Sequence, residues 1–224
     1  MTTHASFYDP PLTRAARHAM VASQLRTNAV SDERVIAAMA HIPREAFLPP
    51  EAGAIAYRDT PIPLGGGRFI NPPLATGRLL TEAMLEPGDR VLLIGAAGGY
   101  AAAVLAGLVA QVTAVESDAS LIAIARRALA ATPKVELVEA PLSAGYAAGG
   151  PYDVLVVDGA VEELPAALLD QLRPGARIVT GLVERGVLRL AVGVKTATGA
   201  GLQAVVDSDC VVLPGFARPI GFRF

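Results

Sequence analysis

The strongest constraint on the fold is an alternation of short apolar runs with helix-like segments between residues 90 and 180. Four runs are short, apolar and mostly rich in β-branched residues, which predicts buried strands: Arg90–Gly95 (RVLLIG), Gln111–Glu116 (QVTAVE), Val135–Val138 and Tyr152–Asp158 (YDVLVVD). Helices are predicted over residues 100–109, 119–131 and 164–172. Strands that alternate with helices in this way form a parallel sheet covered on both faces. The sequence therefore predicts an α/β protein with a doubly wound, Rossmann-like sheet.

The segments that flank this region have a different character. Helices are predicted over residues 12–26, from Ser31 to just before Pro43, and over 74–85. Residues 49–73 are rich in proline and glycine and are expected to form a long irregular connection of functional importance. After a turn at residues 173–175 we expect a strand over 176–180, followed by antiparallel strands over 187–194 and 203–213. We divide the chain into residues 1–85, which pack on the core, and residues 86–224, the Rossmann-like domain, as one structural unit.

Composition and charge narrow the classes of function. The net charge of −2 gives no support for a nucleic-acid or membrane-surface partner. The single cysteine, Cys210, excludes an internal disulfide and suits a reducing compartment. No secretory signal is visible at the start, and the longest apolar run, residues 100–110, is about half of the roughly 20 residues that a membrane span needs. We therefore expect a cytoplasmic protein, in which the three histidines and one cysteine show no metal-site spacing.

A glycine-rich turn follows the first predicted strand. Gly95, Gly98 and Gly99 allow positive φ angles and let the backbone approach a ligand closely. Glu116 ends the next strand, 21 residues after Gly95, where a carboxylate can accept hydrogen bonds from both hydroxyls of a ribose. The pattern indicates a nucleoside-containing cofactor but does not choose between NAD and S-adenosylmethionine, although Ala97 replaces the second glycine of the dinucleotide motif. A plain strand-to-helix turn and a solvated strand-end acid are the alternatives.

Several collinear blocks resemble the protein-L-isoaspartate O-methyltransferases. They are residues 20–26 (MVASQLR), 42–50 (IPREAFLPP), 56–65 (AYRDTPIPLG), 91–106 (VLLIGAAGGYAAAVLA), 151–153 (PYD), 161–165 (VEELP), 168–169 (LL) and 171–175 (QLRPG). Together they cover nearly the whole chain in the family's order, so the resemblance is specific.

The resemblance implies a class I methyltransferase fold with S-adenosyl-L-methionine as cofactor. It also implies a protein or peptide substrate whose isoaspartyl α-carboxylate receives the methyl group. A carboxylate is already ionised at pH 7, so the site needs no general base, only alignment and exclusion of water. The expected cofactor-binding residues are Gly95, Ala96, Ala97, Gly98, Gly99, Tyr100, Glu116, Glu139 and Asp158.

The sequence departs from the family pattern in and around the expected site. Leu93 stands where the family has an acid, and Ala97 where it has a glycine. The substrate loop, residues 67–73 (GRFINPP), carries Asn71 in place of a serine, and we expect Asn71 and Arg68 to contact the substrate carboxylate.

Two further departures concern acids. Pro141 replaces the family's Asp beside the adenine, a role that Glu139 is expected to take over. Asp158 ends its strand where the family usually has threonine.

Three hypotheses follow from these departures. The first is an isoaspartyl-type carboxyl methyltransferase. The second is a methyltransferase of the same fold that acts on another acceptor, suggested by Asn71, Arg68 and Asp158. The third is a non-catalytic protein with weakened cofactor binding, suggested by Leu93, Ala97 and Pro141, because each lost buried hydrogen bond costs about 0.5–1.5 kcal/mol.

Overall fold

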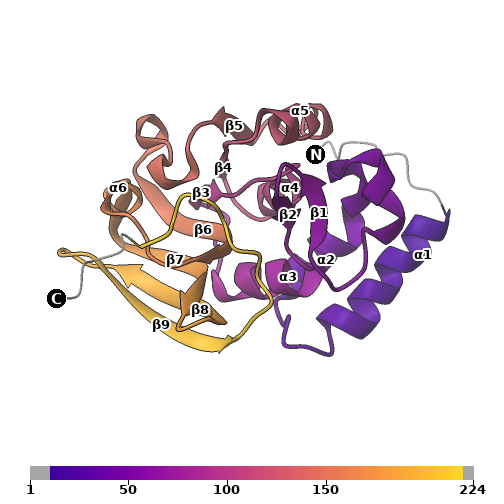
Figure 1. Cartoon of the computed structure of the whole chain (residues 1–224), viewed down its shortest axis with the longest axis horizontal. Helices are drawn as coiled ribbons and strands as arrows, with labels where there is room; N and C mark the ends of the chain where they lie inside the picture. The colour runs from indigo at the N-terminus through magenta and orange to yellow at the C-terminus, as the bar shows by residue number, and fades with distance from the viewer. Residues whose placement is uncertain (1–10, 219–224) are drawn as a thin grey trace.

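The structure, a computed structural model, describes residues 11–218 of the chain. Within these residues the main sheet has seven strands in the order β5-β4-β3-β6-β7-β8-β9 (Figure 1). The strands are β3 (Arg90–Ile94), β4 (Gln111–Glu116), β5 (Val135–Glu139), β6 (Tyr152–Val161), β7 (Leu172–Glu184), β8 (Val187–Lys195) and β9 (Ala200–Asp207). The first five in this order are parallel, and β8 and β9 are antiparallel additions. The predicted doubly wound sheet is confirmed.

Two apolar cores lie on the two faces of the sheet. Successive residues of β3 alternate between them: Val91 and Leu93 belong to one core, and Leu92 and Ile94 to the other. Such strands are apolar at every position because both of their faces are covered. This is why the runs around residues 91–94 and 154–157 were recognisable as buried strands.

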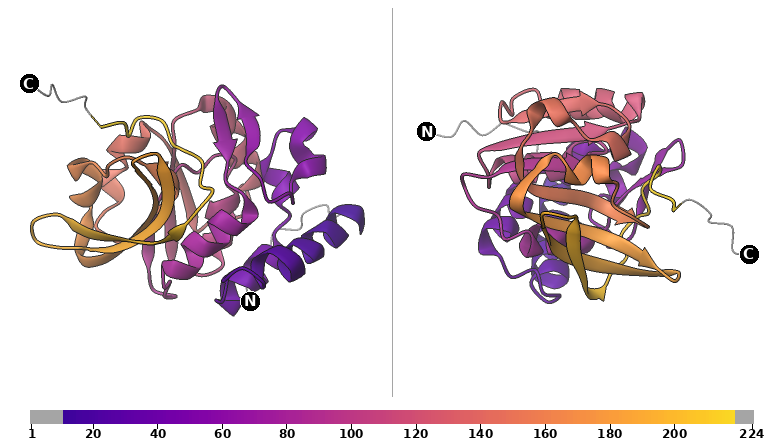
Figure 2. Two further views of the ribbon diagram at one scale, coloured as in Figure 1. Left: turned by 60° about the horizontal axis from the view of Figure 1, so that its bottom comes forward. Right: turned by 90° about the vertical axis from the view of Figure 1, so that its left-hand side faces the viewer.

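The helices divide between these cores (Figures 1 and 2). The larger core joins the sheet to α2, α3, α4 and α5, and the smaller one takes α6 and the chain after β9. The bounds are α1 (Pro11–Met20), α2 (Glu33–His41), α3 (Pro73–Glu82), α4 (Tyr100–Ala106), α5 (Ala119–Ala128) and α6 (Ala166–Leu169). Because the larger core contains residues from before and after position 85, the N-terminal helices pack directly on the sheet. The boundary at residues 85 and 86 stays a prediction.

The N-terminal part is more ordered than the sequence suggested. Residues 49–73 were expected to be irregular, but they contain a 3-10 helix (Pro50–Ile55) and the antiparallel hairpin of β1 (Ile62–Gly65) and β2 (Arg68–Ile70). Alternating buried and exposed residues in both strands account for the hairpin. The short strands and their proline content hid this pattern.

Several predicted boundaries were wrong by a few residues. Helix α2 begins after Asp32, whose carboxylate accepts from Arg34 N, and not after Ser31. Strand β7 continues through the predicted turn at Arg173, Pro174 and Gly175. The helix predicted over residues 164–172 is a single turn, α6, and β9 ends at residue 207 instead of 213.

Strand β6 also runs three residues past Asp158, which was expected to end it. Its pairing with β3 stops at Val157, and its register with β7 shifts between Val156 and Ala160. Asp158 therefore lies in an irregular part of the strand, at the edge of the sheet where β3 and β4 end.

The glycine turn is held against the N-terminal part by a close backbone contact. The 3-10 helix η2 (Arg44–Phe47) comes from the block IPREAF, and a Cβ added to Gly98 would lie 1.9 Å from the carbonyl oxygen of Phe47. Only glycine leaves room for this approach. Tyr100, at the start of α4, packs edge-on against the Phe47 ring at 5.8 Å.

We expect Gly98→Ala to lower the free energy of unfolding by about 3 kcal/mol or more, because the methyl group meets backbone that no rotamer change can move away. Urea unfolding followed by circular dichroism measures the change. The matched control is Gly88→Ala, since a Cβ there meets nothing within 4 Å. Equal stability of the two variants would contradict the close contact.

Candidate functional site

The turn after β3 contains three residues with positive φ angles. Gly95, Ala97 and Gly99 have φ angles of 81°, 48° and 98°. Ala97 is the unfavourable member, because a left-handed conformation costs a residue with a Cβ about 1–2 kcal/mol. Its backbone N–H donates to Glu116 Oε2 at 2.8 Å, which holds the residue in this conformation.

Glu116 is completely buried at the end of β4, beside the turn. Three backbone N–H groups donate to its carboxylate: Ala97 at 2.8 Å, Ser117 at 2.7 Å and Asp118 at 3.0 Å. The Arg68 guanidinium forms a two-pronged ion pair with both carboxylate oxygens, with Nη2 3.0 Å from Oε2. The acid that the sequence assigns to a ribose thus has a full set of donors from the chain itself.

Arg68 reaches this position from the first residue of β2. Its side chain is 8% exposed, which is low for an arginine. The tip of the hairpin lies over the junction of β4 and α5, where a Cβ added to Gly66 would lie 3.2 Å from Asp118 Oδ2. The structure therefore brings together two residues, Arg68 and Glu116, that the sequence placed on the substrate side and the cofactor side of the site.

A second pair of expected site residues also bonds internally. Asn71 Nδ2 donates to Asp158 Oδ1 at 2.7 Å, and the Thr76 hydroxyl donates to the same oxygen at 2.9 Å. Asn71 Oδ1 accepts from Val211 N at 2.7 Å. Burial raises the pKa of Asp158, and the bonds from Asn71 and Thr76 and the charge of Arg44 oppose this shift.

Arg44 lies behind Asn71 and was not predicted as a site residue. It is fully buried, its Nη2 donates to the carbonyl oxygen of Asn71, and its guanidinium lies 4.8 Å over the ring of Tyr100. Among the described residues its Nε and Nη1 have no hydrogen-bond acceptor. Burial lowers the pKa of Arg44 and raises that of Tyr100 to about 12. The block IPREAF contained Arg44, but nothing in its spacing showed that the side chain points inward.

The chain after β9 covers the glycine turn from the other side. Leu213 is 4% exposed, and a Cβ added to Gly95 would lie 2.9 Å from its Cδ1. A Cβ on Gly159 would lie 2.5 Å from Leu213 Cγ. Leu213 N donates to Ala160 O at 2.9 Å, and in Figure 1 this segment, in yellow, crosses in front of β6. The sequence placed a strand here and gave no sign that Leu213 would cover the turn.

Two other positions compared with the family pattern are Glu139 and Leu93. Glu139 is exposed at the end of β5, where it pairs in register with Glu116, so its role near an adenine stays a prediction. Leu93, at the position of the family's acid, is fully buried in the larger core. Among residues 11–218 no group of three or more His, Cys, Asp or Glu side chains is placed to hold a metal ion.

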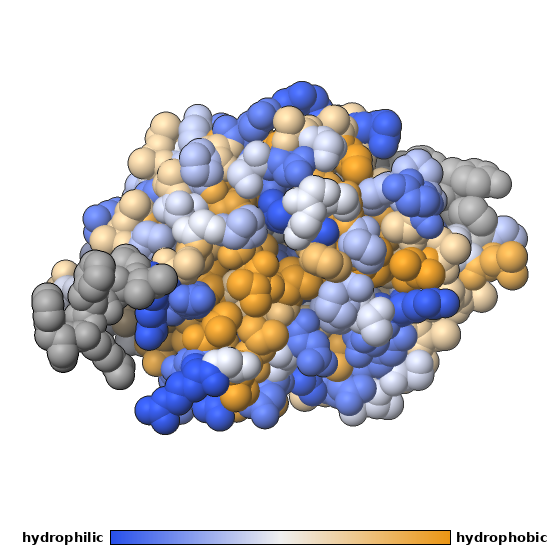
Figure 3. Space-filling model, in the orientation of Figure 1, coloured by the Kyte–Doolittle hydropathy of each residue, from blue (hydrophilic) through white to orange (hydrophobic). Residues whose placement is uncertain are grey.

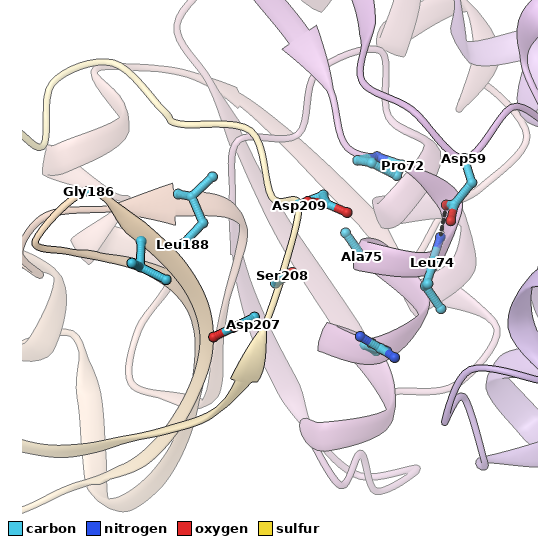
Figure 4. Close-up of a pocket in the computed structure, with 11 residues that line it drawn as sticks. Asp59, Pro72, Leu74, Ala75, Gly186, Leu188, Asp207, Ser208 and Asp209 are labelled. Atoms are coloured by element: carbon cyan, nitrogen blue, oxygen red, sulfur yellow. Dashed lines mark hydrogen bonds between the residues drawn. The ribbon is translucent and has the colours of Figure 1, made fainter.

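A groove of about 430 Å³ lies between the start of α3 and the end of β9 (Figure 4), and Pro72, the residue after Asn71, is part of its lining. Its charged lining residues are Asp59, Asp207, Asp209 and Arg78. In the orientation of Figure 1, apolar surface covers the centre and lower left of the face (Figure 3), and the exposed valines of the C-terminal half include Val187, Val206 and Val212. With three carboxylates and one guanidinium, the groove repels a free carboxylate.

The sheet order, the glycine turn and the acid on the neighbouring strand define the class I S-adenosylmethionine-dependent methyltransferase fold. The chain belongs to the protein-L-isoaspartate(D-aspartate) O-methyltransferase family, whose sequence profile matches residues 15–212. Both sequence-based predictions, the fold class and the family, are confirmed. The family and its cofactor, S-adenosylmethionine, also agree with the expectation from the sequence.

Relatives from distant organisms share this similarity. A protein-L-isoaspartate O-methyltransferase of Koribacter versatilis is 38% identical over 92% of this chain and 93% of its own length. One from Hyperthermus butylicus is 35% identical over 90% and 88% of the two chains. A solved protein-L-isoaspartate O-methyltransferase superposes with a TM-score of 0.76 at 24% identity, over 89% of this chain and 66% of its own. A putative member from Plasmodium falciparum, in complex with S-adenosyl-L-homocysteine, gives 0.75 at 19% identity, over 88% and 97%.

In the described conformation, two of the positions that the sequence assigns to the cofactor are in contact with side chains of this chain. A ribose bonded to Glu116 would have to replace the Arg68 guanidinium, because both carboxylate oxygens are already bonded. The space against Gly95 is taken by Leu213. Arg68 and Leu213 therefore contact Glu116 and Gly95, the two residues from which the sequence predicts a nucleoside site.

We expect Cys210 to resist thiol reagents in the folded protein. It is 2% exposed, and burial raises its pKa to about 12, so at pH 8 the reactive thiolate is scarce. Labelling with a chromogenic disulfide should be about 100-fold slower or more in buffer than in urea. Similar rates in the two conditions would show that the chain after β9 does not lie against the sheet.

Asp158 predicts a specific dependence of stability on pH. Because its pKa in the folded chain is raised, the folded state holds this proton more tightly, and the free energy of unfolding falls as pH rises from about 4, the ordinary pKa. Asp158→Asn lacks this titration. Chemical unfolding of both proteins between pH 4 and 8 should show wild type losing stability relative to the variant, and a difference independent of pH would contradict the shift.

Proposed function

We propose that this chain is an S-adenosylmethionine-dependent O-methyltransferase that esterifies the α-carboxylate of L-isoaspartyl residues in proteins and peptides. The observation that carries the proposal is the family match over residues 15–212, together with relatives of that activity's name at 35–42% identity. The glycine turn and Glu116 support it, because both lie where class I enzymes of this fold bind a nucleoside.

Methyl transfer to a carboxylate needs no general base from the protein's side chains. The acceptor carboxylate is ionised at neutral pH, so the site has to bind it, align it and exclude water. Asn71 is the proposed hydrogen-bond donor to it, since Nδ2 already bonds a carboxylate oxygen, that of Asp158. A role for Arg68 as a second donor requires its guanidinium to leave Glu116 and stays a prediction.

The charge of Asp158 affects which chemical group the site can bind as methyl acceptor. An ionised carboxylate next to Asn71 repels a second carboxylate, and this favours the hypothesis of a different acceptor. The raised pKa of Asp158 reduces that repulsion, because it favours the neutral form. The isoaspartyl acceptor therefore remains the leading proposal, and a neutral acceptor is the second.

The protein partner and the location belong to the same proposal. A polypeptide substrate suits the groove that begins beside Asn71 at Pro72 and has apolar surroundings. The acids that line this groove would favour basic or neutral flanking residues in the substrate.

Among the described residues no helix is long and apolar enough to cross a membrane. A cytoplasmic location is supported by the free thiol of Cys210, since a reducing compartment leaves thiols unpaired.

The proposal predicts a base-labile methyl ester on an isoaspartyl peptide incubated with the protein and labelled S-adenosylmethionine. The control is the same peptide with a normal aspartate, which should stay unlabelled. Volatile label released at high pH measures the ester. Labelling of a different component of a cell extract, but not of the isoaspartyl peptide, would favour another acceptor. Absence of any ester at millimolar cofactor would contradict catalysis.

A further inference from the structure

The Arg68–Glu116 ion pair involves the same carboxylate that a ribose would need. Both groups are buried, and the guanidinium bonds both carboxylate oxygens. Two parallel hydrogen bonds of this kind match the number that two vicinal ribose hydroxyls would make to the same carboxylate. Arg68 and a ribose therefore cannot bond Glu116 in this way at the same time.

The Arg68 guanidinium also competes strongly with a ligand for the Glu116 carboxylate. A buried carboxylate that loses a bonded cation keeps its charge in a medium of low polarity, which is costly unless another donor replaces it. Three backbone N–H groups remain on Glu116 when Arg68 leaves, so the carboxylate stays partly satisfied. The exchange of guanidinium for hydroxyls is thus feasible, but it opposes ligand binding.

The tip of the hairpin that carries Arg68 has room to move, although Ile62 and Ile70 in its two strands are buried in the larger core. β1 and β2 form a separate two-stranded sheet that is not paired with any of the seven strands of the main sheet. Gly65, Gly66 and Gly67 all have positive φ angles, and a Cβ added to Gly65 or Gly67 would meet nothing within 4 Å. The hairpin tip is therefore loosely packed, and it can withdraw Arg68 without breaking a strand pairing of the main sheet.

We propose that Arg68 is an intramolecular competitor for the nucleoside subsite at Glu116, and that its withdrawal sets the affinity of this chain for its cofactor. The proposal rests on the proposed function, because it takes the ligand of this subsite to be the ribose of an S-adenosyl compound. It assigns Arg68 a role against cofactor binding, whereas a purely structural ion pair would support the folded site and thereby the binding of ligand.

The test compares S-adenosylhomocysteine binding by calorimetry in wild type, Arg68→Gln and Arg68→Ala. The control is Arg127→Gln, which makes the same change of charge at an exposed arginine on α5. We expect the two Arg68 variants to bind at least about tenfold more tightly, equivalent to about 1.4 kcal/mol, and Arg127→Gln to bind as wild type does. The melting temperature of the free Arg68 variants should fall, so stability and affinity move in opposite directions.

A second measurement uses the wild-type protein and needs no folded variant. Phenylglyoxal modifies accessible guanidinium groups, and mass spectrometry reads each site. Arg68 should be protected in the free protein and become modified when S-adenosylhomocysteine is added, while modification of Arg127 stays constant.

The outcomes separate the two proposals. If wild type binds S-adenosylhomocysteine and the Arg68 variants bind equally or more weakly, or if Arg68 stays protected in the complex, the competitor role is wrong and the proposed function stands. If wild type, both Arg68 variants and the control all fail to bind at millimolar ligand, the proposed function is wrong and the competitor role falls with it.

Discussion

The carboxylate of Glu116 organises the centre of this molecule. It gathers backbone N–H groups from the turn after β3 and from the start of α5, and a guanidinium from the hairpin β1–β2. These donors come from three parts of the chain that are far apart in sequence. Because a fully buried carboxylate must be satisfied by donors, its position fixes the conformation of Ala97 and the place of the hairpin together.

A backbone contact completes this arrangement. The carbonyl oxygen of Phe47 reaches so close to Gly98 that no side chain fits between them. The IPREAF block and the glycine turn, two blocks that share no local pattern, are therefore complementary parts of one contact. This contact joins an N-terminal part of the chain to the glycine turn, in addition to the larger apolar core in which both take part.

The sequence predicted the sheet well because buried parallel strands such as residues 91–94 are apolar at every position. The spacing between Gly95 and Glu116 then indicated a glycine turn after one strand and an acid at the end of the next. It predicted poorly wherever partners are distant. Arg68 bonds a residue 48 positions away, and Leu213 covers a glycine more than 100 residues earlier. No periodicity of a single sequence encodes such pairs, so the sequence could name these residues as candidates but could not predict the bonds between them.

The two acids expected to face a ligand illustrate a general condition on buried charge. Glu116 and Asp158 both lie at the edge of the sheet where β3 and β4 end, and each accepts hydrogen bonds from within the chain: Arg68 donates to one, Asn71 and Thr76 to the other. A folded chain cannot leave such groups unpaired, since the penalty for an isolated buried charge exceeds the gain from most single contacts. A ligand that uses them is bound only by the difference between its own hydrogen bonds and those it displaces. Arg68 and Asn71 already donate hydrogen bonds to these acids in the free chain. They therefore affect the affinity of such a site as much as the acids themselves do.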